Sequence, residues 1–406
     1  MRLLLWVRIP TLLALCWTRF LRKPRSAAIS HPQSFIIFRL DSLGDLVLAT
    51  PLFRELKRNF PDAHLTVVAQ QAYRSVLVTN PHIDEVLGVR SSRSNWLPKG
   101  LLNLLATVGL YWRELRGRQF DAAISPRWDI DEHLATLLCL LTNARVRVGY
   151  SERASPGKQR YNRGFDRAFD ICLEPGPLQH EVLRNLAIVE ALGGTLHDTA
   201  LEIHLTAEDH AYAERTLTGV GEGCVLIAVG IGARSPGRRW PLERYAACLS
   251  ELSNEYDITT VITCAPAEHD SAMHLAAVLE NRSIISDSAE IRETCALLAR
   301  CDLFIGNDTG AAHLAAAMDC PTIVISRHPK SGDPEHPNSP ARFAPWGAPV
   351  KVLQPESGRD ECTTHCLHTE PHCIEQIPVA EVVAAAKTIL MQSKQASDKL
   401  GASLSL

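Results

Sequence analysis

The sequence is poor in several features that identify whole classes of protein. Its 12 cysteines among 406 residues amount to about 3%, against the roughly 8–10% of a disulfide scaffold. We therefore expect a reducing, cytoplasmic compartment. Neither sign of charge dominates, because 42 Lys and Arg stand against 45 Asp and Glu, a net charge of -3. No global field draws the chain onto nucleic acid, and any charge-driven binding has to be local.

Several catalytic motifs are also missing. There is no phosphate loop of the Walker type, and the one dinucleotide-like glycine pattern, at Gly230 and Gly232, has Ser235 in place of its third glycine. These absences argue against an ATPase and a dehydrogenase. A nucleophile elbow and a zinc-protease helix are missing too.

Long apolar runs are absent even at the N-terminus, where residues 1–31 combine apolar and aromatic side chains with basic ones. The uncharged run between Arg8 and Arg19 is shorter than the roughly 20 residues that span a bilayer. A basic, amphipathic stretch of this kind predicts an interfacial anchor on an anionic leaflet. Two alternatives fit the same pattern: a signal peptide cleaved near Ser26 to Ala28, and a helix that packs on the core.

The rest of the chain alternates short apolar runs with amphipathic stretches, which is typical of an α/β protein with a parallel sheet covered on both faces. Strands are expected at 35–40, 65–69, 85–89 and 122–125, and in a second series at 225–229, 259–263, 303–305 and 322–325. Helices are expected, among other places, at 101–115, 133–141, 242–255 and 311–318. The stretches 151–167 and 327–349 are expected to be loops.

This repetition and the chain length both favour two domains. We place them at residues 32–203 and 204–392, with a last helix over 379–391 and a flexible tail over 393–406. The region between two such sheets is the expected ligand site.

The strongest local motif is the stretch 306–313, which lies between an expected strand and an expected helix. Its small residues let a ligand approach the backbone, and the free N–H groups of the helix suit a pyrophosphate. His313 follows Thr309 by one helical turn, so both side chains can reach the same phosphates. The alternative is an ordinary turn in which Thr309 or Asp308 caps the helix.

Two further motifs follow the first strand of each series. After the second-series strand, a flexible loop carries Arg238 and Arg239, of which Arg238 is the better candidate for a phosphate contact and Arg239 a surface cation beside Trp240. After the first strand, Asp45 is placed as a general base. An Asp in a first helical turn is equally explained as complementing the helix dipole.

A cluster of Cys and His near the C-terminus suggests a metal site. It contains Cys362, Cys366 and Cys373 with three histidines between them. The spacing lacks the paired knuckle of common zinc sites, so a buried thiol cluster is the preferred interpretation.

Taken in order, the three motifs resemble those of glycosyltransferase family nine, the ADP-heptose:lipopolysaccharide heptosyltransferases. The resemblance rests on residues 39–45 followed by Thr50 and Pro51, on 238–244, and on 306–310 with 313–315. It implies a GT-B fold: two facing Rossmann-like domains, with the acceptor in the first, the donor nucleotide in the second, and a last helix that returns to the first domain. It also implies an inverting transfer of heptose to the inner core of lipopolysaccharide.

The resemblance carries roles onto matching residues. Asp45 matches the family's catalytic base, and Glu268 matches a residue that contacts the ribose. Arg238 stands where the family usually has a phosphate-binding Lys, a change that keeps the charge but alters reach and hydration. Positions that hold the donor's diphosphate are matched by Asp308, Thr309, Gly310 and His313.

The resemblance further implies an ADP-sugar as donor substrate, no cofactor and no metal, because fixed protein charges can neutralise the departing diphosphate. It also suggests a site for the acidic lipopolysaccharide acceptor on the basic stretch, at Arg153, Lys158, Arg160 and Arg163. That stretch is equally explained as a solvated loop. The expected location is cytoplasmic and peripheral on the inner face of the inner membrane, without nucleic acid as a partner.

Three alternatives to a heptosyltransferase remain at this point. The first is a glycosyltransferase that uses another nucleotide sugar for a surface polysaccharide. The other two are a sugar-nucleotide epimerase of the same architecture and a sugar-nucleotide-binding protein without turnover.

Overall fold

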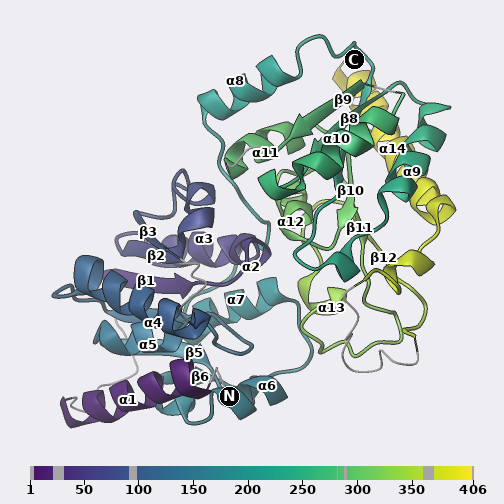
Figure 1. Ribbon diagram of the computed structural model, residues 1–406. Coiled ribbons are helices and arrows are strands. Elements are labelled where there is room, and N and C mark those ends of the chain that lie inside the picture. The colour runs from purple at the N-terminus through teal and green to yellow at the C-terminus, as the bar shows by residue number, and fades with distance from the viewer. Residues whose placement is uncertain are drawn as a thin grey trace. The chain divides into compact units, whose positions relative to one another are not determined.

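A computed structural model describes residues 4–21, 32–90, 98–280, 282–287, 290–359 and 370–404. The chain divides into two compact units, Met1–Thr199 and Ala200–Leu406, close to the boundary expected at 203/204 (Figure 1). Each unit is built around its own sheet, as the two series of apolar runs predict.

The sheet of unit 1 is six-stranded and parallel, in the order β3-β2-β1-β4-β5-β6. Four of its strands were expected, and the last two were not, because β5 is interrupted by Arg147 and β6 is only three residues long. The strands are β1 Ser34–Arg39, β2 His64–Gln70, β3 Glu85–Val89, β4 Ala122–Ser125, β5 Val146–Tyr150 and β6 Ile171–Leu173.

Both faces of this sheet are buried, which explains why β1 is apolar without alternation. Phe35 and Ile37 pack against α3 and α7, whereas Ile36 and Phe38 pack on the opposite face against α4 and α5. The helices are η1 Leu4–Arg8, α1 Ile9–Leu21, α2 Leu43–Val47, α3 Thr50–Asn59, η2 Gln71–Val76, α4 Lys99–Leu110, η3 Tyr111–Leu115, α5 Ala135–Leu141, η4 Glu152–Ala154, α6 Pro156–Tyr161, η5 Phe165–Ala168 and α7 Glu181–Ala191.

The N-terminal helix α1 is a packed element of unit 1. Its buried residues Thr11 and Leu15 continue a stripe that begins at Val7 of η1, one helical turn apart. The helix contacts α5 and η5, where Leu137 and Phe165 lie in the same core cluster. The core-packing alternative is therefore confirmed for this face of the helix. Among the described residues no helix is both long and apolar enough to cross a bilayer.

The expectation of an irregular loop over 151–167 is wrong, because two 3-10 helices and α6 occupy it. Carboxylates hold this segment together. Asp166 accepts hydrogen bonds from the Ser151 hydroxyl at 2.9 Å and the Glu152 N–H at 2.6 Å. Polar side chains fold these short helices, so apolar periodicity gave no signal for them.

Unit 2 repeats the same topology with the order β12-β11-β10-β7-β8-β9. The strands are β7 Val225–Gly230, β8 Ile258–Thr263, β9 Arg282–Ser286, β10 Leu303–Asn307, β11 Thr322–Ile325 and β12 Val350–Leu353. The helices are α8 Ala207–Thr216, η6 Pro236–Arg238, α9 Leu242–Ser253, η7 Pro266–Glu268, α10 His269–Val278, α11 Ile291–Leu298, α12 Gly310–Ala317, α13 Pro340–Phe343, η9 Ile374–Gln376 and α14 Val379–Leu404.

The last helix, α14, begins at the expected position. Its side chains Val382, Val383 and Ala386 are buried in the core of unit 2, where the helix packs along α9. The return of this helix to the first domain stays a prediction.

Candidate active site

In unit 1 the sequence motif lies where the order of strands reverses. Strands are added on one side of β1 and then, from β4 onward, on the other, and ligands of open α/β sheets bind at the carboxyl ends of the strands at such a point. The turn after β1 carries Asp41, Ser42 and Asp45, and the turn after β4 carries Arg127.

The two carboxylate oxygens of Asp45 have different partners. Oδ2 accepts hydrogen bonds from the Ser42 hydroxyl at 2.6 Å and from the Ser42 N–H at 3.1 Å, which makes Asp45 the N3 member of a capping box on α2. Oδ1 lies 3.4 Å from the Arg39 guanidinium and 3.6 Å from that of Arg127. The capping role is therefore real, and it leaves Oδ1 as the oxygen on the side of the arginines.

Arg39 and Arg127 belong to a network of opposite charges. Arg39 is fully buried, pairs with Glu181 at 2.9 Å and lies 3.5 Å from Asp41. Arg127, which retains 21% exposure, lies 3.4 Å from Asp41. Sequence analysis assigned no role to Arg127 or Glu181, although the single charge of Arg39 inside an apolar strand was a visible signal.

This network decides the protonation state of Asp45. Burial raises the pKa of the Asp45 carboxyl, but Arg39, Arg127 and the two Ser42 hydrogen bonds outweigh it and hold the pKa below its usual value. The carboxylate is therefore ionised at neutral pH. In return, the carboxylates around Arg39 outweigh the effect of burial and raise its pKa.

The basic residues proposed to bind the acceptor are not equivalent. Lys158 is only 3% exposed, and its ammonium group donates to the carbonyl oxygens of Arg127 at 2.7 Å and Trp128 at 3.3 Å. The expectation that Lys158 joins an exposed basic surface is wrong, because burial removes it from solvent and lowers its pKa to about 8. It holds the turn that presents Arg127.

The other three basic residues are exposed. Arg153 pairs with Glu174, the Arg160 guanidinium lies over the Tyr161 ring, and the Arg163 carbonyl accepts a hydrogen bond from Arg8. Their contact with an acceptor stays a prediction.

Unit 2 places its two motifs at the equivalent reversal, between β7 and β10. The Arg238 guanidinium, from the turn after β7, donates to the Asp308 carbonyl oxygen and lies 3.1 Å from its carboxylate. Two residues expected at the donor phosphates are thus in contact. Arg238 remains 26% exposed, so it keeps an accessible edge.

The start of α12 carries free N–H groups. Thr309 is the N-cap residue by position, in an extended conformation with φ of -147°, but no side chain makes the capping hydrogen bond. Thr309 is therefore the N-cap of this helix without a capping hydrogen bond from its side chain. First-turn N–H groups without a side-chain cap are suited to an anion. His313, one turn later, is buried at 6% exposure.

Glu268 approaches the glycine loop closely. A Cβ atom at Gly232 would lie 2.0 Å from the Glu268 Oε2, so any other residue there would displace the Glu268 carboxylate. Arg239 lies 3.4 Å from the Glu268 carboxylate and donates to the Ala233 carbonyl. Arg239 is 42% exposed, as expected of a surface cation, and it also ties the loop to Glu268.

Asn307 holds the loop that carries Arg238 through hydrogen bonds, and the sequence motif suggested no role for it. It is fully buried, and its amide donates to the carbonyls of Ile231 at 2.9 Å and Gly232 at 3.3 Å. Its oxygen accepts from the Trp240 N–H at 2.8 Å and the Tyr245 hydroxyl at 3.2 Å. One side chain therefore connects the carboxyl end of β10 to both ends of the Arg238 loop.

Comparison with protein families gives a match over residues 108–363 to the model described as glycosyltransferase family 9 (heptosyltransferase). The chain belongs to this family. It is therefore a glycosyltransferase, as the three sequence motifs predicted.

Relatives of family 9 match most of the chain at low identity. The "Lipopolysaccharide heptosyltransferase 3" of Escherichia coli (strain K12) is 25% identical over 363 residues, which cover 88% of this chain and 98% of the relative. Among solved structures, a family 9 glycosyltransferase from Veillonella parvula DSM 2008 has a TM-score of 0.68 at 20% identity, covering 90% of this chain and 100% of its own. The E. coli heptosyltransferase WaaC with ADP has a TM-score of 0.64 at 17% identity, with 88% and 99% covered. The GT-B-like fold expected from the sequence is confirmed.

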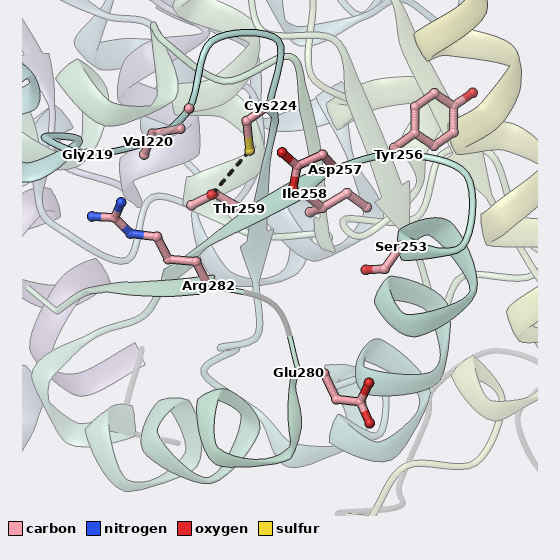
Figure 2. Close-up of a pocket in the computed structure, with 11 residues that line it drawn as sticks. Gly219, Val220, Cys224, Ser253, Tyr256, Asp257, Ile258, Thr259, Glu280 and Arg282 are labelled. Carbon is pink, nitrogen blue, oxygen red and sulfur yellow. Dashed lines mark hydrogen bonds between the residues drawn. The ribbon is translucent and has the colours of Figure 1, made fainter.

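A pocket on unit 2 of this family 9 chain lies away from these motifs. Figure 2 shows its lining, which includes Cys224, Asp257 and Arg282, residues that begin or directly precede β7, β8 and β9. The Cys224 thiol lies 3.2 Å from the Thr259 hydroxyl there. The pocket is therefore at the amino ends of the strands, whereas the Arg238 loop and Asp308 follow carboxyl ends.

The cluster of Cys and His near the C-terminus, for which a buried thiol cluster was preferred to a metal site, falls mostly outside the described residues, because Cys362 and Cys366 lie beyond them. Within them Cys373 is buried, with its sulfur 3.0 Å from the His372 Nδ1. The described part of the chain holds no group of three metal-ligating side chains, and a zinc site at the full cluster is untested.

Proposed function

We propose that this protein is an inverting glycosyltransferase that transfers heptose from ADP-heptose to the inner core of lipopolysaccharide, with Asp45 as general base. The observation that carries the proposal is the ionised Asp45 carboxylate beside Arg39 and Arg127 at the reversal point of unit 1, in a chain that belongs to family 9. Relatives named as lipopolysaccharide heptosyltransferases support the donor and the acceptor.

In this mechanism the acceptor hydroxyl gives its proton to Asp45 Oδ1 as its oxygen attacks the anomeric carbon of the donor. The new C–O bond forms on the face opposite ADP, the bond to ADP breaks, and the configuration inverts. The Ser42 hydrogen bonds keep Oδ2 in place, so Oδ1 is the oxygen that receives the proton.

The departing diphosphate needs positive charge in place before it leaves. Arg238 and the N–H groups at the start of α12, beside Thr309 and Gly310, supply it in this proposal, with His313 one turn further. Glu268 is proposed to contact the ribose. These fixed charges make a metal or cofactor unnecessary for the transfer.

The acceptor is proposed to bind unit 1, where the exposed Arg153, Arg160 and Arg163 suit its acidic groups. Because such an acceptor is anchored in lipid, the protein is proposed to act in the cytoplasm in peripheral contact with the inner face of the inner membrane. Nucleic acid is not a partner in this proposal.

The test is release of nucleoside diphosphate from a panel of ADP-, UDP- and GDP-sugars, with and without heptose-deficient lipopolysaccharide. The expected result is acceptor-dependent release of ADP from ADP-heptose only. Release from another sugar would replace the donor, release without acceptor would indicate an epimerase, and no release would favour a binding protein.

The base is tested by Asp45→Asn, which should lower turnover by about 10²–10⁴-fold while ADP still binds. Asp209→Asn is the matched control, because Asp209 occupies the same N3 position in the capping box of α8. That control should keep full turnover. Normal activity of Asp45→Asn would overturn the assignment of the base.

A further inference from the structure

Two neighbouring helical segments of unit 1 expose large apolar side chains to solvent. On α1, Ile9 is 48% and Leu13 is 66% exposed, one turn apart. On α4 and the following η3, Leu105, Val108 and Trp112 are 54%, 37% and 55% exposed, in the i, i+3, i+7 spacing of a single helical stripe. We call these five residues the α1–α4 surface.

The two segments meet through η1 and pack on the same part of the core. A Cβ atom at Gly100 of α4 would lie 2.6 Å from the Trp6 Cβ of η1, so the first turn of α4 touches the segment that leads into α1. Leu12 of α1 and Leu104 of α4 both pack on the cluster around Val7 and Phe165. The buried side of each helix is therefore fixed, which also fixes its exposed side.

The charged side chains beside Trp112 are mostly basic. Arg113 and Arg116 are exposed there, and Glu114 is the acidic residue between them. Within the described part, the Arg116 guanidinium lies 4.3 Å from the centre of the Trp112 ring. Trp beside Arg is a combination suited to the boundary between lipid headgroups and acyl chains.

We infer that the α1–α4 surface lies on an anionic lipid bilayer, with Trp112 and Leu105 inserted between headgroups and Arg113 and Arg116 on lipid phosphates. This deepens the proposed function, because it names the surface through which the enzyme meets the membrane that holds its acceptor. A second copy of the chain fits less well, since a two-fold contact sets the same patch against itself and here brings basic groups together.

The geometry also changes the kind of contact expected from the N-terminal segment. Since Val7, Thr11 and Leu15 are buried in unit 1, α1 offers the membrane only its outer face, together with α4. The unit as a whole is then held on the bilayer, rather than tethered by a separate helix.

The experiment is co-sedimentation of the full chain with phosphatidylcholine vesicles, with and without phosphatidylglycerol. Binding is expected only with the anionic lipid and should weaken as salt is raised. The double variant Leu105→Glu/Trp112→Glu should bind at least about tenfold more weakly. Met273→Glu/Val278→Glu is the matched control, since those α10 residues are 51% and 56% exposed in unit 2, and it should bind as the unaltered protein does.

A second variant guards against misfolding. Ile9→Ser/Leu13→Ser replaces the α1 half of the surface with small polar groups and should also weaken binding to vesicles. Equal binding of both altered proteins and the unaltered one would overturn the inference. So would a change from dimer to monomer in these variants with vesicle binding unaltered, which would assign the surface to a second copy.

The assays distinguish failure of the membrane-binding inference from failure of the proposed function. Transfer to a deacylated, water-soluble acceptor needs no membrane, so the surface variants should keep full turnover in that assay while losing vesicle binding. A protein that binds anionic vesicles but transfers no heptose would refute the proposed function and leave the inference standing.

Discussion

The Asp45 carboxylate has a role in local structure and, as the proposed base, a role in catalysis. Oδ2 closes the capping box with Ser42, and Oδ1 faces the two arginines. The hydrogen bonds that stabilise the start of α2 therefore also set the proton affinity of the proposed base. A substitution at Ser42 should act on catalysis without touching either substrate.

Ser42→Ala removes the hydroxyl hydrogen bond and leaves the N–H bond to Oδ2. Because that hydroxyl helps to lower the pKa of Asp45, its loss should raise this pKa and move the acid limb of kcat/KM to higher pH. A net hydrogen bond of about 0.5–1.5 kcal/mol corresponds to a shift of about one pH unit or less. The pH–rate profile measures this, and Ser42→Thr, which keeps a hydroxyl, should retain the original limb. An acid limb that does not move would separate Ser42 from the base.

Asn307→Ala should weaken donor binding, because it releases the backbone carbonyls and the Trp240 N–H that order the Arg238 loop. We expect the affinity for ADP to fall about tenfold or more while the KM for the acceptor changes little, and calorimetric titration with ADP measures it. Asn185→Ala is the matched control, because Asn185 is equally buried but lies in unit 1, bonded to the Leu48 carbonyl. If both variants bind ADP as the unaltered protein does, Asn307 has no positioning role.

The sequence was informative at this scale wherever a residue belongs to a continuous motif, as Asp45, Arg238 and Asp308 do. It could not reveal partners that come from distant segments. Glu181, which pairs with Arg39, lies 142 positions from it in the sequence. Lys158 was expected on the surface, but it is buried by its contacts with the turn after β4, which is distant in the sequence. Such contacts depend on how the strands are ordered, which no local pattern contains.

Among the elements, α1 shows the limit of apolar periodicity. A stripe of apolar residues predicts a helix with one apolar face, but the same stripe serves a core or a bilayer. The two sides of α1 differ in exposure: Leu15 on one side is 4% exposed, whereas Leu13 on the other is 66% exposed. The short helices at 152–168 escaped prediction for another reason, since carboxylates rather than apolar contacts hold them.

This division predicts different outcomes for two leucines of the same helix. Leu15→Ala should lower the free energy of unfolding of unit 1 by about 2–4 kcal/mol, because it leaves a cavity beside Leu140 and Ala168. Leu13→Ala should change it by less than about 0.5 kcal/mol. Denaturant unfolding of the two variants measures both values. Equal effects would mean that α1 does not pack on unit 1 in solution.

At the scale of the whole molecule, the alternation of strands and helices was enough to predict two parallel α/β units. The strands that were missed lie away from the centre of each sheet: β5 and β6 on one side in unit 1, and β9 and β12 at the two edges in unit 2. These are short and partly exposed or interrupted by polar residues, so their apolar signal is weak. The central strands, which carry the site residues, were all expected.

The charges of unit 1 also predict how it responds to acid. Four carboxyls of unit 1 have a lowered pKa. The hydrogen bond from Arg118 is the main cause for Glu85. For Asp45, Glu55 and Asp84, hydrogen bonds and nearby cations outweigh the opposite effect of burial. A group whose pKa is lower when folded adds stability above its unfolded pKa and loses it as pH falls through the folded value. Unit 1 should therefore keep its stability down to about pH 5 and lose it progressively below about pH 4.

Hydrogen exchange followed by mass spectrometry, corrected for the intrinsic rate at each pH, resolves this loss for the peptides of unit 1. Glu85→Gln cannot ionise and should lose less stability over the same range. A unit 1 that is as stable at pH 3.5 as at pH 6 would contradict the prediction.

The two units have the same order of strands, and each carries its candidate site residues where that order reverses. The chain passes from unit 1 to unit 2 between Thr199 and Ala200. The hydrogen bonds described above for the Asn307 loop come from residues of unit 2, and the hydrogen bonds and ion pairs described for Asp45 come from residues of unit 1. With the donor on unit 2 and the acceptor on unit 1, as proposed, donor choice and acceptor choice can evolve as separate traits. Chimaeras of family 9 enzymes joined at this crossing should inherit their nucleotide sugar from one parent and their acceptor from the other.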